Sequence, residues 1–303
     1  MEWFVGNRVA SQSGVAVASG TKYSEGGLRS INSFRVVDYK NPTNPVVVGL
    51  IETNDFGFLD LAMADGYAYV ACGSIGLLVI DIRTPSNPVI VANLDTPGWA
   101  WSVTVSGNYA YVADGTLGLR IYDITDRRAP VFVSTLDTPG NARHIAVLDN
   151  LAYVADSGNF TIIDVRNKLA PVNLVTNKLS NGQTAVQVKV QNYQGRILAY
   201  VATSASGLLT IDASNPLALV KLPILAPTGG PNVTTIGVEV DGATAYVANY
   251  DGGLGIIDIT KPDAPIQSGS VAGLQNVMAV SFDRSSRLVL AADTIGGMLV
   301  IRP

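Results

Sequence analysis

The sequence is poor in the side chains that most catalytic and metal sites use. It has one cysteine, Cys72, and one histidine, His144, in 303 residues. A lone cysteine excludes an intramolecular disulfide, and a lone histidine excludes a three-histidine zinc site. A catalytic thiolate at Cys72 would need His144 or a cation close by, and the two residues fall two repeats apart in the pattern that runs through the chain. We therefore expect no Cys–His catalytic pair.

Charged residues are also scarce. They make up 15% of the chain, against about 25% in an average soluble domain. The net charge of -4 at pH 7 comes without a basic stripe, so we expect no nucleic-acid partner. No apolar stretch approaches the roughly 20 residues of a membrane span, so we expect no span either. The Thr-, Ser-, Asn- and Gly-rich, Lys-poor composition suggests an extracellular or cell-envelope location.

What the sequence has is a repeat. A strand-like Ala-Tyr-Val-Ala, a glycine turn and an apolar run ending in Asp recur along the chain. The run-ending Asp stands at Asp38, Asp81, Asp123, Asp164, Asp212 and Asp258, and Arg302 takes its place in the last repeat, at intervals of 41 to 48 residues. That is the range of propeller blades, about 40–50 residues, and leucine-rich repeats are much shorter. Seven repeats of this length account for the chain.

Each repeat divides into four short runs of β-branched and aromatic residues, separated by Gly, Asn, Asp and Pro. This is the signature of strands joined by tight turns, and no window reads as a capped amphipathic helix. We therefore predict an all-β fold, a seven-bladed β-propeller of four-stranded antiparallel blades, with residues 1–303 as a single domain.

Two segments depart from the repeat. The chain ends after the third strand of the seventh repeat, and residues 1–6 belong to no other repeat. We predict that residues 1–6 form a strand that completes the last blade and closes the ring, which would remove an open sheet edge. Residues 20–33 are an insertion between the second and third strands of the first repeat, expected as a loop on the face of the blade-connecting loops.

The strand endings resemble those of a known family. They read Leu-Leu-Val-Ile-Asp at 77–81, Ile-Ile-Asp at 162–164, Gly-Ile-Ile-Asp at 255–258 and Leu-Val-Ile at 299–301. Asn-Pro or Ala-Pro and a new apolar strand follow at 87–89, 129–131 and 264–266. This pattern resembles the LVIVD-repeat family of bacteria and archaea. The resemblance implies a β-propeller, commonly in exported or cell-surface proteins, and it implies no reaction.

Two sets of repeated polar residues could bind a metal or could serve the turns. The Asp that ends each third strand is typical of an Asx turn, in which the carboxylate accepts a nearby backbone N–H. A second set follows the second strands: Ser19, Cys72, Asp114, Asp156, Thr203, Asn249 and Asp293. The carboxylates of Asp114, Asp156 and Asp293 could hold Ca²⁺, the only cofactor the sequence suggests. Small polar turn-forming residues explain the same set without an ion.

The loops between blades carry the most distinctive residues. Aromatic rings stand there beside amides and charges, which together suit a sugar or peptide site. The predicted ligand-binding residues are Phe56, Phe58, Trp99, Trp101, Arg143, His144, Gln183, Asn232 and Gln275. The alternative is that Phe58 and Trp101 fill gaps between blades and that the amides cap turns.

Three functions compete. The first is a non-catalytic interaction module that binds a protein or glycan through the loop face, and we favour it because no catalytic constellation is evident. The second is a Ca²⁺-assisted hydrolase or lyase at the channel mouth, using Arg143, His144, Asp114 and Asp156. The third is a structural spacer within a larger surface protein. A fold alone does not decide among them.

Overall fold

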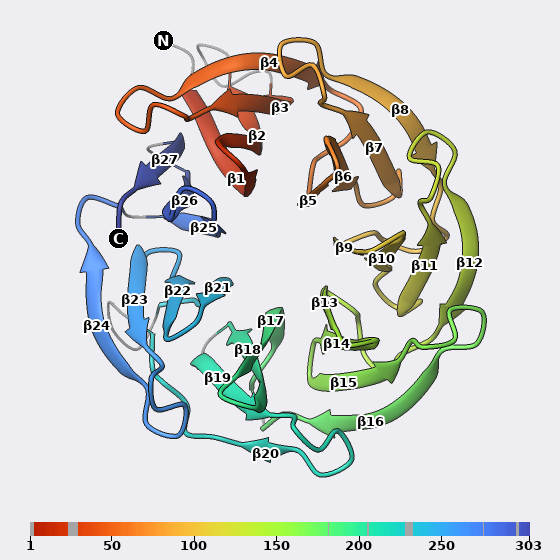
Figure 1. The fold of residues 1–303 in the computed structure, drawn as a ribbon, viewed down its shortest axis with the longest axis vertical. Helices are drawn as coiled ribbons and strands as arrows, with labels where there is room; N and C mark the ends of the chain where they lie inside the picture. Colours follow the sequence, from red (N-terminus) through yellow and green to blue (C-terminus); the bar gives the residue numbers. More distant parts are fainter. Residues whose placement is uncertain are drawn as a thin grey trace.

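Seven antiparallel sheets stand around a central axis like the blades of a propeller (Figure 1). The computed structural model describes residues 3–23, 30–180, 182–204, 206–227, 233–274, 276–294 and 297–303. Six sheets have four strands and the last has three in this part of the chain. The predicted seven-bladed β-propeller is confirmed. Nowhere in these ranges is there a helix long and apolar enough to cross a membrane.

In every blade the strands run in chain order from the axis to the rim. Blade 1 has β1 (Trp3–Gln12), β2 (Val15–Tyr23), β3 (Ser30–Asp38) and β4 (Val46–Thr53). Blade 2 has β5 (Asp60–Ala64), β6 (Tyr67–Ala71), β7 (Leu77–Asp81) and β8 (Val89–Leu94). Blade 3 has β9 (Ser102–Ser106), β10 (Tyr109–Ala113), β11 (Leu119–Asp123) and β12 (Val131–Leu136). Blade 4 has β13 (His144–Leu148), β14 (Leu151–Asp156), β15 (Asn159–Asp164) and β16 (Val172–Lys178).

The remaining blades repeat this order. Blade 5 has β17 (Ala185–Tyr193), β18 (Arg196–Thr203), β19 (Gly207–Asp212) and β20 (Val220–Lys221). Blade 6 has β21 (Gly237–Asp241), β22 (Thr244–Ala248), β23 (Leu254–Asp258) and β24 (Ile266–Val271). Blade 7 has β25 (Val277–Asp283), β26 (Leu288–Asp293) and β27 (Gly297–Ile301).

The second strands read as unbroken apolar runs because both of their faces are buried. In β6, Tyr69 and Ala71 pack toward blade 3, whereas Ala68 and Val70 pack toward blade 1. Successive side chains of a strand point to opposite sides, so a strand between two neighbours must be apolar at every position. The core is accordingly a series of clusters between neighbouring blades.

The Asp at the end of each third strand serves the following turn. In all six blades that have it, its carboxylate accepts the backbone N–H two residues later, at 2.8–3.1 Å. The interpretation of these residues as Asx turns is confirmed.

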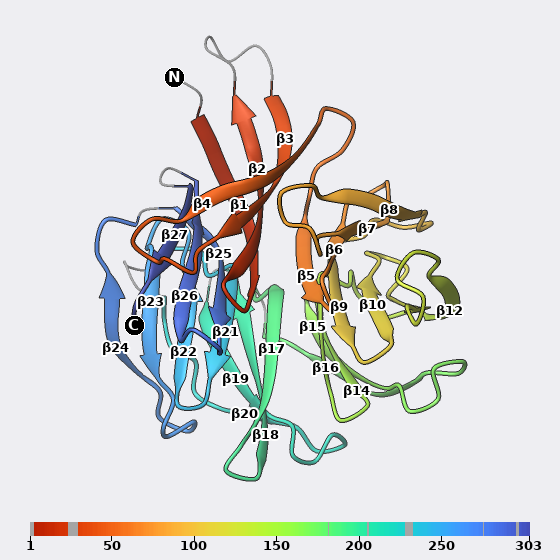
Figure 2. The same cartoon turned by 45° about the horizontal axis from the view of Figure 1, so that its top comes forward.

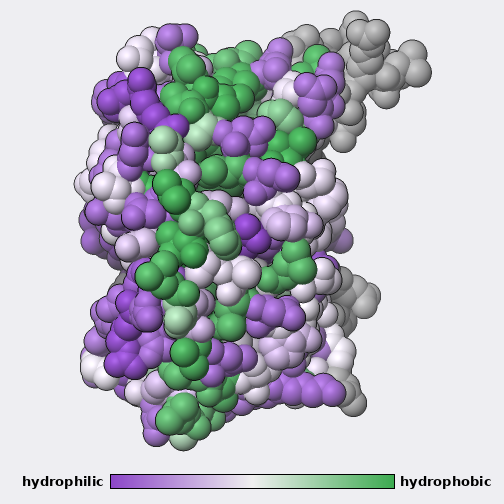
Figure 3. All heavy atoms as spheres, turned by 90° about the vertical axis from the view of Figure 1, so that its right-hand side faces the viewer, coloured by the Kyte–Doolittle hydropathy of each residue, from purple (hydrophilic) through white to green (hydrophobic). Residues whose placement is uncertain are grey.

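The outermost strands carry an apolar band along the rim. The fourth strands of blades 1 to 6 each begin with an exposed apolar side chain or two. These are Val46, Val47, Val89, Ile90, Val131, Phe132, Val172, Val220 and Ile266. Figure 3 shows apolar side chains running as a stripe along one side of the ring. The next blade partly covers these edges. Ser134 in β12 donates to the carbonyl of Lys168 in blade 4, and a Cβ at Gly49 in β4 would lie 2.1 Å from the carbonyl oxygen of Pro85. Such cover protects an edge strand from pairing with other chains.

The predicted closure strand is wrong. The N-terminal strand pairs with β2 of its own blade, with Trp3 opposite Tyr23 and Gly6 opposite Gly20. Its first residues therefore lengthen blade 1 instead of completing blade 7. The ring closes by packing between these two blades, where Val9, Ala16 and Tyr39 meet Leu290 and Ala292. Buried apolar area joins the first blade to the last, and the described strands of the two blades form separate sheets.

A buried carboxylate also ties these two blades together. Asp283 accepts a 2.6 Å hydrogen bond from the Tyr39 hydroxyl and one of 3.2 Å from the Gly14 backbone N–H, both across the closure. Burial alone would raise its pKa, but hydrogen bonds from Tyr39, Ser285 and Ser286 hold the pKa of Asp283 well below its usual value. The carboxylate is therefore ionised in the folded ring.

The insertion at residues 20–33 is in large part strand. Gly20–Tyr23 continue β2 and Ser30–Ser33 belong to β3, with Thr21 opposite Asn32, and residues 24–29 lie outside the described part. Residues 3–6, 20–23 and 30–33 together form the blade-1 extension. It rises beyond the other blades (Figure 2), by roughly 13 Å for four residues of about 3.3 Å each. In the described ranges no other blade extends on this side, although the β17–β18 hairpin of blade 5 is lengthened at its opposite end, where Tyr193 pairs with Arg196.

Candidate functional site

One face of the ring gathers the blade-connecting loops and the turns that follow the second strands. Isolated bridges join the two sets, pairing Gly73 with Ala100, Gly115 with Ala142 and Ser157 with Ala185. The blade-1 extension rises from the same face, because it continues β2 past Ser19, where the other blades turn. We call this side the loop face.

Two of the polar residues after the second strands fix the incoming loop of their own blade. Asp156 accepts a 2.9 Å bond from the Thr138 hydroxyl and another of 2.9 Å from the Gly140 N–H. Asp114 accepts the Gly98 N–H at 3.1 Å. The glycine is required at these places, since a Cβ on Gly98 would lie 2.3 Å from the backbone oxygen of Asp114. This contact explains the repeated Asp-Thr-Pro-Gly at 95–98 and 137–140.

The three residues predicted to bind Ca²⁺ are not brought together. Asp114, Asp156 and Asp293 are fully buried at the ends of β10, β14 and β26 in three different blades. In the described ranges, no group of three or more His, Cys, Asp or Glu side chains could hold a metal ion. Cys72 of the same set is buried, and burial raises the pKa of its thiol to about 12. An uncharged thiol of this kind is a poor nucleophile.

Three of the predicted binding residues form a platform on the loop face. Trp99 is 47% exposed, and its ring centroid lies 6.1 Å from that of Trp101. The Arg143 guanidinium stacks over the Trp101 ring at 4.8 Å. Stacking of a cation on an indole holds both side chains in place. We call Trp99, Trp101 and Arg143 the indole platform.

The other predicted residues have different places. Phe58 is buried between blades 1 and 2, edge-on to Phe56 with ring centroids 5.5 Å apart. Its packing matches the alternative in which it fills a gap. Gln183 is buried and accepts the Ser180 N–H at 3.1 Å, which closes a turn. Asn232 and Gln275 lie outside the described residues.

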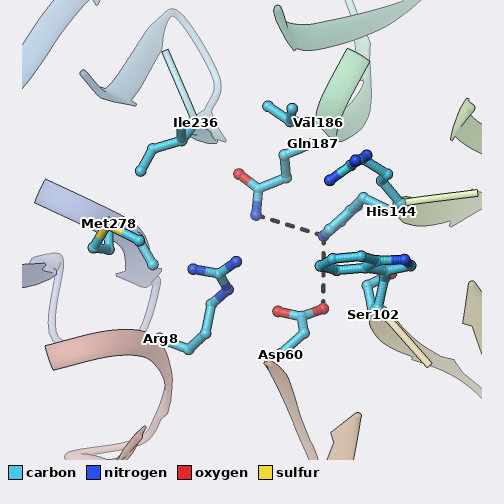
Figure 4. Close-up of a pocket in the computed structure, with 11 residues that line it drawn as sticks. Arg8, Asp60, Ser102, His144, Val186, Gln187, Ile236 and Met278 are labelled. Atoms are coloured by element: carbon cyan, nitrogen blue, oxygen red, sulfur yellow. Dashed lines mark hydrogen bonds and ion pairs between the residues drawn. The ribbon is translucent and has the colours of Figure 1, made fainter. Parts of the chain in front are cut away.

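A cavity of about 180 Å³ opens beside the indole platform. Arg8, Asp60, Ser102, His144 and Gln187 reach it from the innermost strands of five different blades (Figure 4). Val186, Ile236 and Met278 supply an apolar side, and Trp101 and Arg143 also line it. A second cavity of about 260 Å³ shares Arg8, Asp60 and His144, and it adds Lys189, Glu239 and Arg284. Together the two cavities form the central channel.

Charges in the channel compensate one another. Burial raises the pKa of Asp60 and lowers that of Arg8, while their mutual attraction opposes both changes. Lys189 and Glu239 form an ion pair at 3.0 Å. Although burial opposes it, attraction to Glu239 raises the pKa of Lys189. Burial, followed by the charges of Lys189 and Arg8, holds the pKa of His144 well below 6.5, so the ring is neutral.

The His144 ring stands between two polar partners. Its Nε2 lies 3.5 Å from the Gln187 Nε2 and 3.9 Å from an Asp60 carboxylate oxygen, as the dashed lines of Figure 4 show. Gln187 is itself anchored, because its Oε1 accepts the Val238 N–H at 2.6 Å. Asp60 accepts the Val103 N–H at 3.2 Å. These bonds tie the polar centre of the channel to the backbones of two blades, blade 3 and blade 6.

Of the channel residues, the sequence interpretation found only Trp101, Arg143 and His144. Asp60, Ser102 and Gln187 share one position, opposite the last alanine of the Ala-Tyr-Val-Ala run in the second strand. That alanine recurs from blade to blade, whereas the residue opposite it is different in each. Variation at one position of an otherwise regular repeat is the signal that could have found them.

Comparisons with known proteins agree with this fold. The family model of the LVIVD repeat matches residues 59–96, 97–138, 139–177, 197–221 and 234–273. The crystal structure of the Myceliophteria_thermophila Cps50 (Swd1) beta-propeller domain is 12% identical, with a TM-score of 0.73 over 100% of both chains. That of the computationally designed Ika8 protein is 10% identical, with a TM-score of 0.66 over 99% of this chain and 96% of the other. These identities show the fold alone. A search of curated proteins finds no match.

Proposed function

The chain belongs to the LVIVD-repeat family, and from this premise we propose that it is a non-catalytic binding module that holds a protein partner on its loop face. The observation that carries the proposal is the exposure of Trp99, whose side chain is 47% accessible beside a stacked Trp101–Arg143 pair. Tryptophan and arginine are the residues that most often dominate the energy of protein interfaces. A propeller is a general scaffold for such interactions, and the platform supplies the specific surface.

The geometry of the platform favours a protein over a glycan. A sugar ring stacks on an open indole face, and the Arg143 guanidinium already covers one face of Trp101. Trp99 offers a partly exposed ring that rests against Gly73, and the Arg143 cation lies on the neighbouring Trp101. An apolar anchor beside a positive charge suits a peptide segment that carries an aromatic or aliphatic side chain and a carboxylate.

The blade-1 extension adds a second surface on the same side. It stands roughly 13 Å above the ring, as a hydrogen-bonded sheet and not as an unstructured loop. A partner bound on the loop face would also contact the side of this extension. Residues on a rigid scaffold bind with a smaller loss of conformational entropy than residues on a mobile loop.

We also propose that the protein works outside the cell or in the cell envelope. The low share of charged residues, 15%, supports this location. Labelling of intact source cells with a membrane-impermeant biotin reagent tests it. Recovery of the labelled protein is expected, and its presence in the cytosolic fraction alone would overturn the proposal.

Selection of random linear peptides on the immobilised protein tests the binding function. We expect peptides whose affinity falls about tenfold or more in Trp99→Ala, since removing a central interface tryptophan costs roughly 2 kcal/mol or more. Leu217→Ala is the matched control, because Leu217 is also an exposed apolar residue but lies in the connection after β19, away from the platform.

Two results would contradict the proposal. One is a set of selected peptides that bind Trp99→Ala and the wild-type protein equally well. The other is a selection that recovers no peptide above the background of an unrelated immobilised protein. Equal losses in Trp99→Ala and Leu217→Ala would also count against the platform, because they would point to general stickiness of exposed apolar residues.

A further inference from the structure

The cavity beside the platform has more hydrogen-bond donors than its own acceptors satisfy. His144 and Ser102 are only 7% and 1% exposed, and both line the cavity. The Nδ1 of His144 and the Oγ of Ser102 have no hydrogen-bond partner. Buried polar atoms without partners are rare, because leaving one unpaired destabilises the fold.

The state of the His144 ring follows from its neighbour. Because the Gln187 Oε1 accepts the Val238 N–H, the amide NH₂ of Gln187 faces the His144 Nε2. The neutral ring therefore accepts at Nε2 and carries its proton on Nδ1. The unpartnered Nδ1 is thus a donor, and the Ser102 hydroxyl on β9 of the neighbouring blade can donate as well. An occupant has to bring acceptor atoms.

Charge points to the same kind of occupant. The cavity is lined by two guanidinium groups, those of Arg8 and Arg143, and by one carboxylate, that of Asp60. Asp60 already accepts the Val103 N–H and lies in the field of Arg8. An ammonium group would meet two cations there, whereas an anion would be attracted by both and repelled by Asp60 alone.

The opposite side of the cavity is apolar. Val186, Ile236 and Met278 line it, and Ile236 and Met278 stand across the opening from His144 (Figure 4). The cavity measures about 180 Å³, and an apolar cavity of about 150 Å³ is large enough for benzene. The space therefore fits a molecule of about six carbon atoms with one polar end.

We propose that this cavity binds a short aliphatic monocarboxylate. Arg8 and Arg143 supply positive charge to its carboxylate. The carboxylate oxygens accept from the Ser102 hydroxyl and the His144 Nδ1–H once these side chains, whose two donor atoms are closed off in the empty protein, rotate toward the cavity. Its hydrocarbon chain lies against Ile236 and Met278. The site lies inside the channel and does not depend on a partner at Trp99, so it is separate from the proposed protein-binding function.

Isothermal titration of the full-length protein with acetate, butyrate, pentanoate and hexanoate tests the proposal, with pentylamine, pentanol and inorganic phosphate as probes of chemistry. Affinity should rise roughly three- to fourfold per added methylene up to the length that fills the cavity. Pentylamine, pentanol and phosphate should bind at least about tenfold more weakly than pentanoate, because each lacks one of the two required features.

Two variants separate the site from a general effect on folding. Ser102→Ala removes an unpaired buried hydroxyl, so the empty protein should be as stable as the wild type or more so, while pentanoate binds about tenfold more weakly. Ser106→Ala is the control, at the exposed end of the same strand. Met278→Ala enlarges the apolar side and should shift the preference toward longer acids.

Several outcomes would overturn the proposal. Equal affinity for pentanoate, pentylamine and pentanol would mean that no anion site exists. Unchanged pentanoate affinity in Ser102→Ala would place the acid elsewhere, and an absence of measurable binding by every acid would leave the cavity without this role. Trp99→Ala should bind pentanoate as tightly as the wild type does. Failure of the peptide selection would therefore leave the proposed acid site untouched.

Discussion

Replacing Tyr39 by Phe removes one hydroxyl from the interface between the first and last blades and leaves the ring in place. That hydroxyl donates to the buried Asp283 carboxylate at 2.6 Å. A hydrogen bond to a charged group contributes about 1.5–3 kcal/mol to the free energy of unfolding. For a chain of this length, such a loss should lower the melting temperature by about 2 to 5 °C. Urea and thermal unfolding followed by circular dichroism measure both quantities.

The pH dependence gives the same prediction a second readout. Asp283 has a lowered pKa in the folded state, so its contribution is present above the unfolded value, near 3.8, and is lost as pH falls below it. The unfolded chains of the wild-type protein and Tyr39→Phe titrate alike, so the stability gap between them should be constant from about pH 4 to 8. It should narrow only well below pH 4, as the pH approaches the lowered pKa of Asp283 in the folded state.

Two further variants sharpen the test. Tyr109→Phe, a half-buried tyrosine in β10 away from the closure, is the control and should change stability by less than about 0.5 kcal/mol. In Asp283→Asn, the added Tyr39→Phe change should cost less than it does in the wild-type protein, because the two residues share one bond. Equal effects of Tyr39→Phe and Tyr109→Phe, or a gap that does not vary with pH, would refute the role given to this bond.

Three other variants or groups give measurable expectations. Gly98→Ala should destabilise the protein by about 1–3 kcal/mol, because its Cβ would lie 2.3 Å from the Asp114 backbone oxygen. Gly57→Ala is the control and should be close to neutral, because a Cβ there has nothing within 4 Å. Urea unfolding measures both, and similar midpoints for the two variants would contradict this prediction. The Cys72 thiol, with its pKa raised to about 12 by burial, should resist a thiol-specific dye at pH 8 until urea unfolds the chain, and rapid labelling of the native protein would show that it is accessible. Burial and the charges of Lys189 and Arg8 lower the pKa of His144, so its ring should stay neutral in NMR spectra from about pH 8 to 5. The unfolded chain takes up a proton near pH 6.5, so the free energy of unfolding should fall as the pH drops through about 6.5. A ring that titrates near 6.5 in the folded protein would contradict the burial.

The sequence predicts the architecture because the repeat is a physical unit. A second strand buried on both sides, as β6 is, must be apolar throughout, and an Asp such as Asp81 must follow the third strand to accept the next turn's N–H. The first constraint recurs around the ring and the second acts in six of the seven blades, so both appear as periodicity. The closure was mispredicted because residues 3–6 can extend either of two sheets. Their pairing with Gly20–Tyr23 depends on the lengthened hairpin, and the repeat contains no information about that hairpin.

The candidate site was harder to predict because its residues come from different blades. Trp99 and Trp101 stand out in the sequence as aromatic residues in one loop, and the structure puts them together on the loop face. Arg8, Asp60 and Gln187 are far apart in the chain and meet only because each lies on an innermost strand. Their proximity is a property of the closed ring, which no local pattern encodes.

Indole NMR most directly tests the claim that the loop face is the binding face. The chain has three tryptophans, Trp3, Trp99 and Trp101, and each gives one indole N–H signal. Titration with the tightest peptide from the selection should shift the signals of Trp99 and Trp101, with the largest change at Trp99. Tight binding of that peptide with both of these signals unmoved would contradict the proposal and would place the partner elsewhere on the ring.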